Sequence, residues 1–171
     1  MLSLMSSIRE RGYYKLSEPD ALNLIDIDKY TLKNVEERSR DNGEKDLPED
    51  LTQKLLIFGN YLKTKYIDPN WPQSVFNKFL VWQGVDRDNQ GWHTDLFENY
   101  DIFFLFYFDD TFPESGGSIN FKWDKDKTAS FQPKKGDLFL VNNTRGFWHR
   151  AESTQILRRT ASFDFNTITG I

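Results

Sequence analysis

The part of the sequence after Pro72 breaks into short segments of strand character, and this pattern restricts the fold more than any other feature. The segments are rich in aromatic and β-branched residues and are separated by turn-forming residues. Strands are expected near residues 78–83, 90–96, 101–108, 117–123, 128–132, 137–142, 147–151 and 156–165. No pattern of a third long helix interrupts them. Such a succession of short strands favours a double-sheet jelly roll.

Two helices are expected before the strands. Residues 17–20 combine a capping serine, a proline and an acidic residue, which predicts a short helix near 18–30. A second helix is predicted over 49–67, where apolar residues recur every three to four positions. The charged segment between 35 and 50 is predicted to be a solvated loop.

The predicted fold is mainly β with N-terminal helices: a double-stranded β-helix (jelly roll, cupin-like) buttressed by two helices. With 171 residues, the chain is expected to form one domain, 1–171. Within it, 1–72 would be a helical support region and 73–171 the jelly-roll core. Aromatic residues make up 16% of the chain, and this excess suits a β core.

Composition narrows the function. Lys and Arg total 22 against 26 acidic residues, a formal charge of −4, which makes a nucleic-acid partner unlikely on electrostatic grounds. The absence of cysteine excludes disulfides and thiolate-bound metals. The sequence contains no membrane-spanning run and no signal-peptide pattern, so a soluble cytoplasmic protein is expected. The oligomeric state is left open.

The two histidines and one nearby aspartate form a candidate metal-binding set. His93 and Asp95 lie two residues apart in a predicted strand, so their side chains should share a face. His149 lies in another predicted strand. Two imidazoles and one carboxylate on one face of an ion are associated with non-haem Fe(II) oxygenases. The alternative is that one histidine lies on the surface and the other in the core, with no metal.

From Phe79 to Phe165, about half the chain, the order of motifs resembles the Fe(II)/2-oxoglutarate-dependent dioxygenase superfamily, in particular its compact prolyl 4-hydroxylase-like members. His-x-Asp alone is a weak signal, and the ordered set is more specific. The matching motifs, in order, are Gly91-Trp92-His93-Thr94-Asp95, Ser115-Gly116-Gly117, Pro133-Lys134-Lys135-Gly136-Asp137-Leu138-Phe139, His149 and Arg159. The N-terminal part carries no motif that matches the family.

The resemblance implies a chemistry. His93, Asp95 and His149 would bind Fe(II), with 2-oxoglutarate as cosubstrate and ascorbate as a stimulant. The enzyme would hydroxylate a C–H bond of an unidentified substrate, small-molecule or peptidyl, while 2-oxoglutarate is decarboxylated to succinate and CO2. The cofactors carry this chemistry, so no catalytic residue is expected beyond the metal ligands.

Two further residues are predicted to hold 2-oxoglutarate. Tyr107 carries the only hydroxyl on its face of the third predicted strand, and the resembling prolyl hydroxylases have a tyrosine on the equivalent strand that contacts the distal carboxylate. That carboxylate also needs an arginine fork. Strand alternation groups Arg159 with Ala161, Phe163 and Phe165, and groups Arg158 with polar residues. The apolar set is expected to face the barrel interior, which assigns Arg159 to 2-oxoglutarate and turns Arg158 outward.

Two other functions remain open from the sequence alone. A cupin-like module could use the same ligands to bind a metal or small molecule without turnover, or an interaction domain could keep the fold without any metal. The polar turn at 142–146 before His149 either faces the barrel mouth or is an ordinary solvated hairpin loop.

Overall fold

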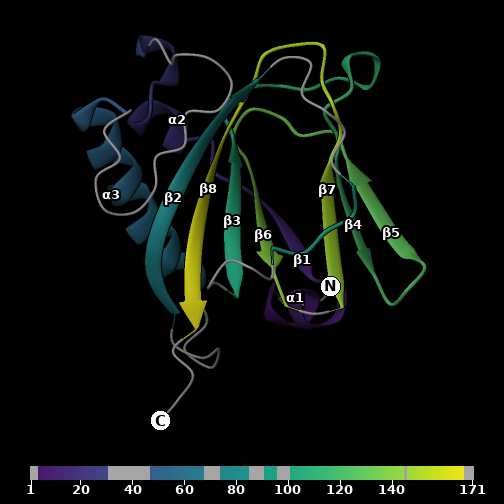
Figure 1. Ribbon diagram of the computed structural model, residues 1–171. Helices are drawn as coiled ribbons and strands as arrows, with labels where there is room; N and C mark the ends of the chain where they lie inside the picture. The colour runs from purple at the N-terminus through teal and green to yellow at the C-terminus, as the bar shows by residue number, and fades with distance from the viewer. Residues whose placement is uncertain are drawn as a thin grey trace.

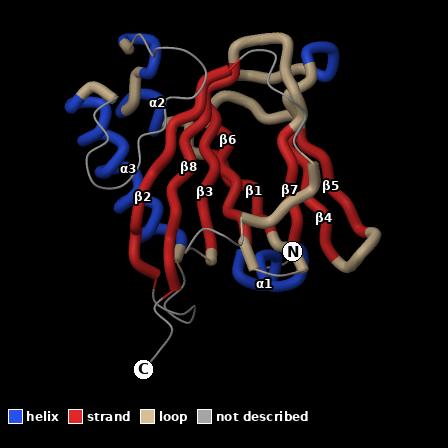
Figure 2. Tube along the Cα trace, viewed as in Figure 1, coloured by secondary structure: helices blue, strands red, loops and turns tan. Residues whose placement is uncertain are grey.

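Two β-sheets face each other, and the long helix covers the outer side of one of them (Figure 1). The computed structural model describes residues 4–30, 47–67, 74–84, 91–95, 101–144 and 146–167, without the side chains of 74–78 and 167. Figure 2 shows the strands as two layers, with loops at the top of the view.

The larger sheet has five antiparallel strands. In spatial order they are β1 (Tyr13–Ser17), β6 (Asp137–Asn142), β3 (Ile102–Tyr107), β8 (Arg158–Thr167) and β2 (Ser74–Gly84). The smaller sheet has three, in the order β5 (Lys127–Phe131), β4 (Ile119–Trp123) and β7 (Phe147–Ala151). This two-sheet arrangement confirms the predicted jelly-roll class.

Among the described residues, one helix is long and the others are short. They are α1 (Leu4–Arg11), α2 (Ala21–Leu24), α3 (Glu49–Tyr66) and the 3-10 turns η1 (Ile27–Lys29) and η2 (Pro113–Ser115). Helix α3 buries one apolar stripe, formed by Leu51, Leu55, Phe58 and Leu62. The ring of Phe58 lies 5.1 Å from that of Phe106 and 5.3 Å from that of Phe163, so the stripe packs on the larger sheet.

A second core lies between the sheets and is dominated by aromatic rings. It contains Tyr13, Phe103, Tyr107, Ile119, Phe121, Phe139 and Val141. Tyr13 stacks on Phe121 of the opposite sheet with ring centroids 4.4 Å apart. Since each buried aromatic side chain contributes roughly 1.5–3 kcal/mol through the hydrophobic effect, this layer holds the two sheets at a fixed separation.

The structure corrects the expected elements at three places. The predicted strand 90–96 is absent from its described part, 91–95, where only an isolated bridge forms between His93 and His149. The larger sheet also contains a strand that was not predicted, β1, which pairs with β6. The predicted helix 18–30 is reduced to α2 and η1. The loop predicted over 35–50 lies mostly outside the described residues.

No helix among the described residues has both the length and the apolar character needed to cross a membrane.

Candidate metal centre

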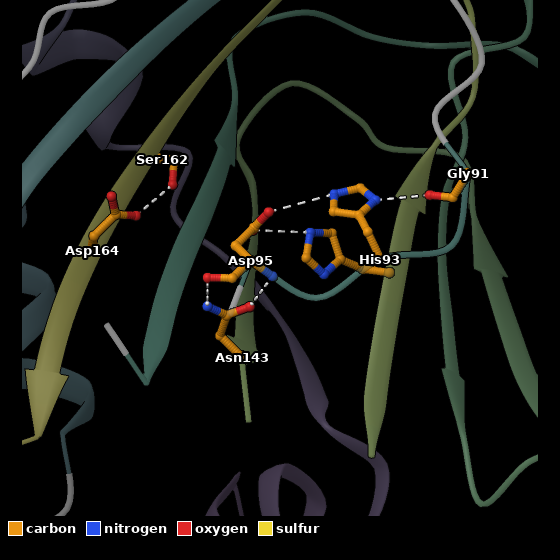
Figure 3. Close-up of polar contacts among 7 residues, drawn as sticks. Gly91, His93, Asp95, Asn143, Ser162 and Asp164 are labelled. Carbon is orange, nitrogen blue, oxygen red and sulfur yellow. Dashed lines mark hydrogen bonds and ion pairs between the residues drawn. The ribbon is translucent and has the colours of Figure 1, made fainter. Parts of the chain in front are cut away.

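His93, Asp95 and His149 form one group of possible metal ligands. Figure 3 shows the side chains of His93 and Asp95 pointing toward each other. The candidate ligand atoms of the three residues all lie within 4.8 Å of one another. The Asp95 carboxylate faces both imidazoles: Oδ1 lies 3.6 Å from Nε2 of His93, and Oδ2 lies 3.4 Å from Nε2 of His149. Since ligand bonds to a first-row metal are about 2.0–2.2 Å long, small side-chain movements would bring these three donors onto one ion.

The local structure orients the ring of His93. Its Nδ1 lies 2.7 Å from the carbonyl oxygen of Gly91, an acceptor that requires a proton on Nδ1. This leaves Nε2, the nitrogen that faces Asp95, as the ring nitrogen that can offer a lone pair to a metal. A backbone carbonyl commonly orients a metal-binding imidazole in this way.

The backbone links the two histidines directly. His93 N–H donates to the carbonyl of His149 at 3.1 Å, and His149 N–H donates back at 3.0 Å. The two rings lie 4.4 Å apart, and the ring of Phe103 lies 5.2 Å from that of His149. His149 is buried, whereas the side chains of His93 and Asp95 are 33% and 29% exposed. The set therefore has one apolar wall and one side open to solvent.

Strand β8 presents opposite faces to the two cores, and this corrects the predicted orientation of its arginines. Residues that pair across antiparallel strands share a face. Tyr107 pairs with Thr160 and Leu105 with Ser162, so the polar set that begins at Arg158 looks between the sheets. Ala161, Phe163 and Phe165 belong instead to the core under α3. Arg159 therefore lies on the helix-covered face, not in the barrel interior as predicted.

Arg159 is held by two carboxylates on that face. Its Nε and Nη2 donate to Asp109 at 2.9 and 2.6 Å, and Nη1 lies 2.7 Å from Oδ1 of Asp28. The Arg159 backbone N–H also donates to Asp109, at 2.7 Å. The hydrogen bonds to Asp109 raise the pKa of the guanidinium above its ordinary value, so its charge is permanent. Arg159 therefore forms ion pairs within the fold, which is a structural role.

Arg158, at the start of β8, lies close enough to Tyr107, at the end of β3, to act on it electrostatically. Burial raises the pKa of the Tyr107 hydroxyl above its ordinary value, and the positive charge of Arg158 opposes this increase. Arg158 donates from Nη1 to the carbonyls of Gly117 and Glu152 at 3.2 and 3.0 Å. Both of these hydrogen bonds, the ones that Arg158 makes within the described residues, use Nη1. The Nε and Nη2 groups of Arg158 can therefore still donate to an anion.

The Ser115-Gly116-Gly117 motif shapes the loop that holds Arg158. Gly116 has φ of 72°, and a Cβ there would lie 2.5 Å from the carbonyl oxygen of Ser153. Only glycine fits this approach. The close contact brings the Gly117 carbonyl to Arg158.

The sequence did not point to Asn143, a residue that contacts one of the candidate ligands, Asp95. It was treated only as part of a polar turn, but its side chain is 2% exposed and pairs with the backbone of Asp95. The only signal was its place shortly before His149. Within the same turn, Arg145 lies outside the described residues.

No protein-family model matches this sequence, and no curated protein matches it at a significant level. Solved structures match its fold. A prolyl hydroxylase from Trichoplax adhaerens, in complex with a hypoxia inducible factor oxygen degradation domain peptide fragment, has a TM-score of 0.70 at 10% identity, covering 96% of this chain and 87% of the other. A 2OG-Fe(II) oxygenase family oxidoreductase from Burkholderia pseudomallei also scores 0.70, at 14% identity, covering 96% and 89%.

A third similar structure is the viral collagen prolyl hydroxylase of Paramecium Bursaria Chlorella virus-1, solved as a 2OG complex. Its TM-score is 0.55 at 13% identity, covering 93% of this chain and 97% of the other. This chain therefore has the fold of the 2OG-Fe(II) oxygenases, and the resemblance seen in the sequence is confirmed at the level of the fold.

Proposed function

We propose that this protein is an Fe(II)- and 2-oxoglutarate-dependent oxygenase that hydroxylates a C–H bond of a small-molecule or peptidyl substrate. The observation that carries the proposal is the convergence of His93, Asp95 and His149 inside a jelly roll. Two imidazoles and one carboxylate suit Fe(II) and leave coordination positions for other ligands. Bound iron and 2-oxoglutarate would supply the oxidation, with succinate and CO2 as coproducts.

Each residue of the site has a defined part in this proposal. His93, held by Gly91, and His149 offer neutral nitrogens, and Asp95 offers the negative charge that a divalent ion needs. Arg158 would pair with the distal carboxylate of 2-oxoglutarate, in place of Arg159, which already binds Asp109 and Asp28. Tyr107 would donate a hydrogen bond to the same carboxylate, and its burial keeps the hydroxyl protonated.

Succinate release tests the proposal. Purified protein is incubated with Fe(II), 2-oxoglutarate and ascorbate, first alone and then with pools of small metabolites or of peptides. We expect succinate from the wild type and none from Asp95→Ala, while Asp126→Ala, which removes an exposed carboxylate from the β4–β5 turn, should retain it. Iron binding without succinate under every condition would indicate the non-catalytic cupin-like module. Absence of iron binding would indicate a structural domain.

Tyr107→Phe tests the cosubstrate site separately. Loss of one hydrogen bond worth about 0.5–1.5 kcal/mol should raise the 2-oxoglutarate requirement by roughly 2–10-fold. Iron affinity should not change, because Tyr107 is not among the candidate metal ligands. An unchanged 2-oxoglutarate requirement would show that Tyr107 only packs in the core.

A further inference from the structure

The segment that carries two of the three metal-ligand candidates, residues 91–95, is not a strand. Within its described residues it has one backbone attachment to the sheet, the pair of hydrogen bonds between His93 and His149. Asp95 lies two residues beyond that bridge. The backbone of Asp95 is held at a second place as well, and this attachment affects the direction of its carboxylate.

Asn143 provides that attachment. Its Oδ1 accepts a hydrogen bond from the backbone N–H of Asp95 at 2.8 Å, and its Nδ2 donates to the carbonyl oxygen of Asp95 at 3.2 Å (Figure 3). One planar amide thus pairs with both backbone polar groups of the same residue. Two bonds in one plane fix the rotation of the Asp95 backbone as well as its position, and this determines where its Cβ points.

Asn143 is itself held by the rest of the fold. Its backbone N–H donates to the carbonyl of Asp101, next to the start of β3, at 2.8 Å. In the same turn, Oδ1 of Asn142 accepts from the N–H and the hydroxyl of Thr144 at 2.9 and 2.6 Å. The N–H of Asn142 donates to Gly12 at 2.7 Å. The amide of Asn143 therefore projects from a segment that is hydrogen-bonded to the residue before β3 and to Gly12, between α1 and β1.

We propose that Asn143 is a positioning residue for the metal ligand Asp95. It holds the Asp95 backbone so that the carboxylate stays between the two imidazoles. This inference rests on the proposed function, because it concerns the metal of that site. A purely structural asparagine would change the stability of the protein and leave metal affinity alone. A residue that orients a ligand from outside the coordination shell changes metal affinity, typically by about 10–100-fold.

The test measures Co(II) affinity and the visible absorption of bound Co(II) in two variants, together with unfolding by urea. Asn143→Ala should bind Co(II) about 10–100-fold more weakly than the wild type and should change the absorption bands, because the ligand geometry relaxes. Asn120→Ala is the matched control. Asn120 is also buried, and its Nδ2 donates to Ser118 and Glu152, neither of which is a candidate ligand. It should lose stability and keep its Co(II) affinity and spectrum.

The outcomes separate this inference from the function on which it rests. Wild-type protein that fails to bind Co(II) would overturn both. Wild type and Asn143→Ala with equal affinity and equal spectra would overturn the role of Asn143 alone. If Asn143→Ala does not fold, Asn143→Ser replaces it. The serine hydroxyl is too short to pair with both backbone groups of Asp95, so the same loss of affinity is expected, and an unchanged affinity would contradict the proposal.

Discussion

The two faces of strand β8 differ in character, and its neighbouring arginines belong to one each. Both faces are buried, so burial alone does not distinguish them. The residues are Arg159, Ala161, Phe163 and Phe165 on the face under α3, and Arg158, Thr160, Ser162 and Asp164 on the face between the sheets. In this jelly roll the apolar face of the strand therefore lies toward the helix layer, and the polar face lies toward the candidate site.

The arginines show the same difference in their partners. Arg159 meets two carboxylates from its own chain, so its charge is balanced within the fold. In the part of the chain that the structure describes, Arg158 meets two carbonyl oxygens, which accept hydrogen bonds but carry no net charge. A buried cation without a counter-ion is costly unless an anion binds beside it. Arg159 should therefore act on stability and Arg158 on ligand binding.

The largest effect is expected from the face under α3. Phe163 is 0% exposed and contacts Phe58, so Phe163→Ala should cost about 3–5 kcal/mol of unfolding free energy through the lost burial and the cavity left behind. Urea unfolding measures it. Ser162→Ala on the other face removes the hydrogen bond that Ser162 donates to the buried Asp164 and should cost less, about 1–3 kcal/mol. Equal losses from the two variants would break the comparison.

Arg159→Ala is expected to have the second-largest effect. It leaves the Asp109 carboxylate, whose side chain is 16% exposed, without its main partner, and should lower the free energy of unfolding by roughly 3 kcal/mol. The affinity for 2-oxoglutarate, measured on the folded metal-loaded protein by calorimetry, should change less than about twofold. A large loss of 2-oxoglutarate binding with unchanged stability would restore the sequence-based assignment of Arg159.

Arg158→Ala should show the reverse pattern. Hydrogen bonds to a charged group contribute about 1.5–3 kcal/mol, so the dissociation constant of 2-oxoglutarate should rise roughly 10–100-fold. Metal affinity should stay near that of the wild type. Arg158→Lys should restore only part of the binding, because an ammonium group cannot offer a planar fork. If Arg158→Ala binds 2-oxoglutarate as tightly as the wild type, the anion site lies elsewhere.

The smallest effect concerns the exposed partner of Arg159. The hydrogen bond from Arg159, followed by its positive charge, lowers the pKa of Asp28 below the ordinary value of 3.8. Because the folded pKa is depressed, the stabilisation is complete above the unfolded pKa and is lost as pH falls through the folded pKa. Asp28→Asn should be slightly less stable than the wild type near neutral pH, and this difference should shrink below pH 3.8. A difference that does not vary with pH would contradict the pairing.

Much of the framework was predictable because its signals are local. The spacing of Leu51, Leu55 and Phe58 predicted α3 and its buried stripe, and β6 and β7 begin and end where the sequence placed them. Strand β1 was missed because its burial does not alternate cleanly and its pairing with β6 is set by a partner more than 100 residues away. A short edge strand of this kind has no local signature.

The residues of the candidate site were largely predictable from the sequence, but the directions in which their side chains point were less so. Strand alternation separated the two sets of β8 residues correctly. It then assigned the wrong set to the interior, because a sheet with a helix on one side has two buried faces, and sequence alternation does not say which layer covers which. Asn143 was not recognised for a related reason. A buried amide that pairs with a distant backbone and a solvated turn residue have the same sequence context.

The backbone bridge between His93 and His149 also bears on how the protein folds. The two residues are far apart in the chain, so the bridge closes a long loop, and the entropy of closing it is lost before any contact in the site compensates. Contacts of such high sequence separation slow folding. The centre should consequently assemble only after β7 has joined β4 and placed His149. The amide protons of His93 and His149 would then gain protection from hydrogen exchange together, in one step.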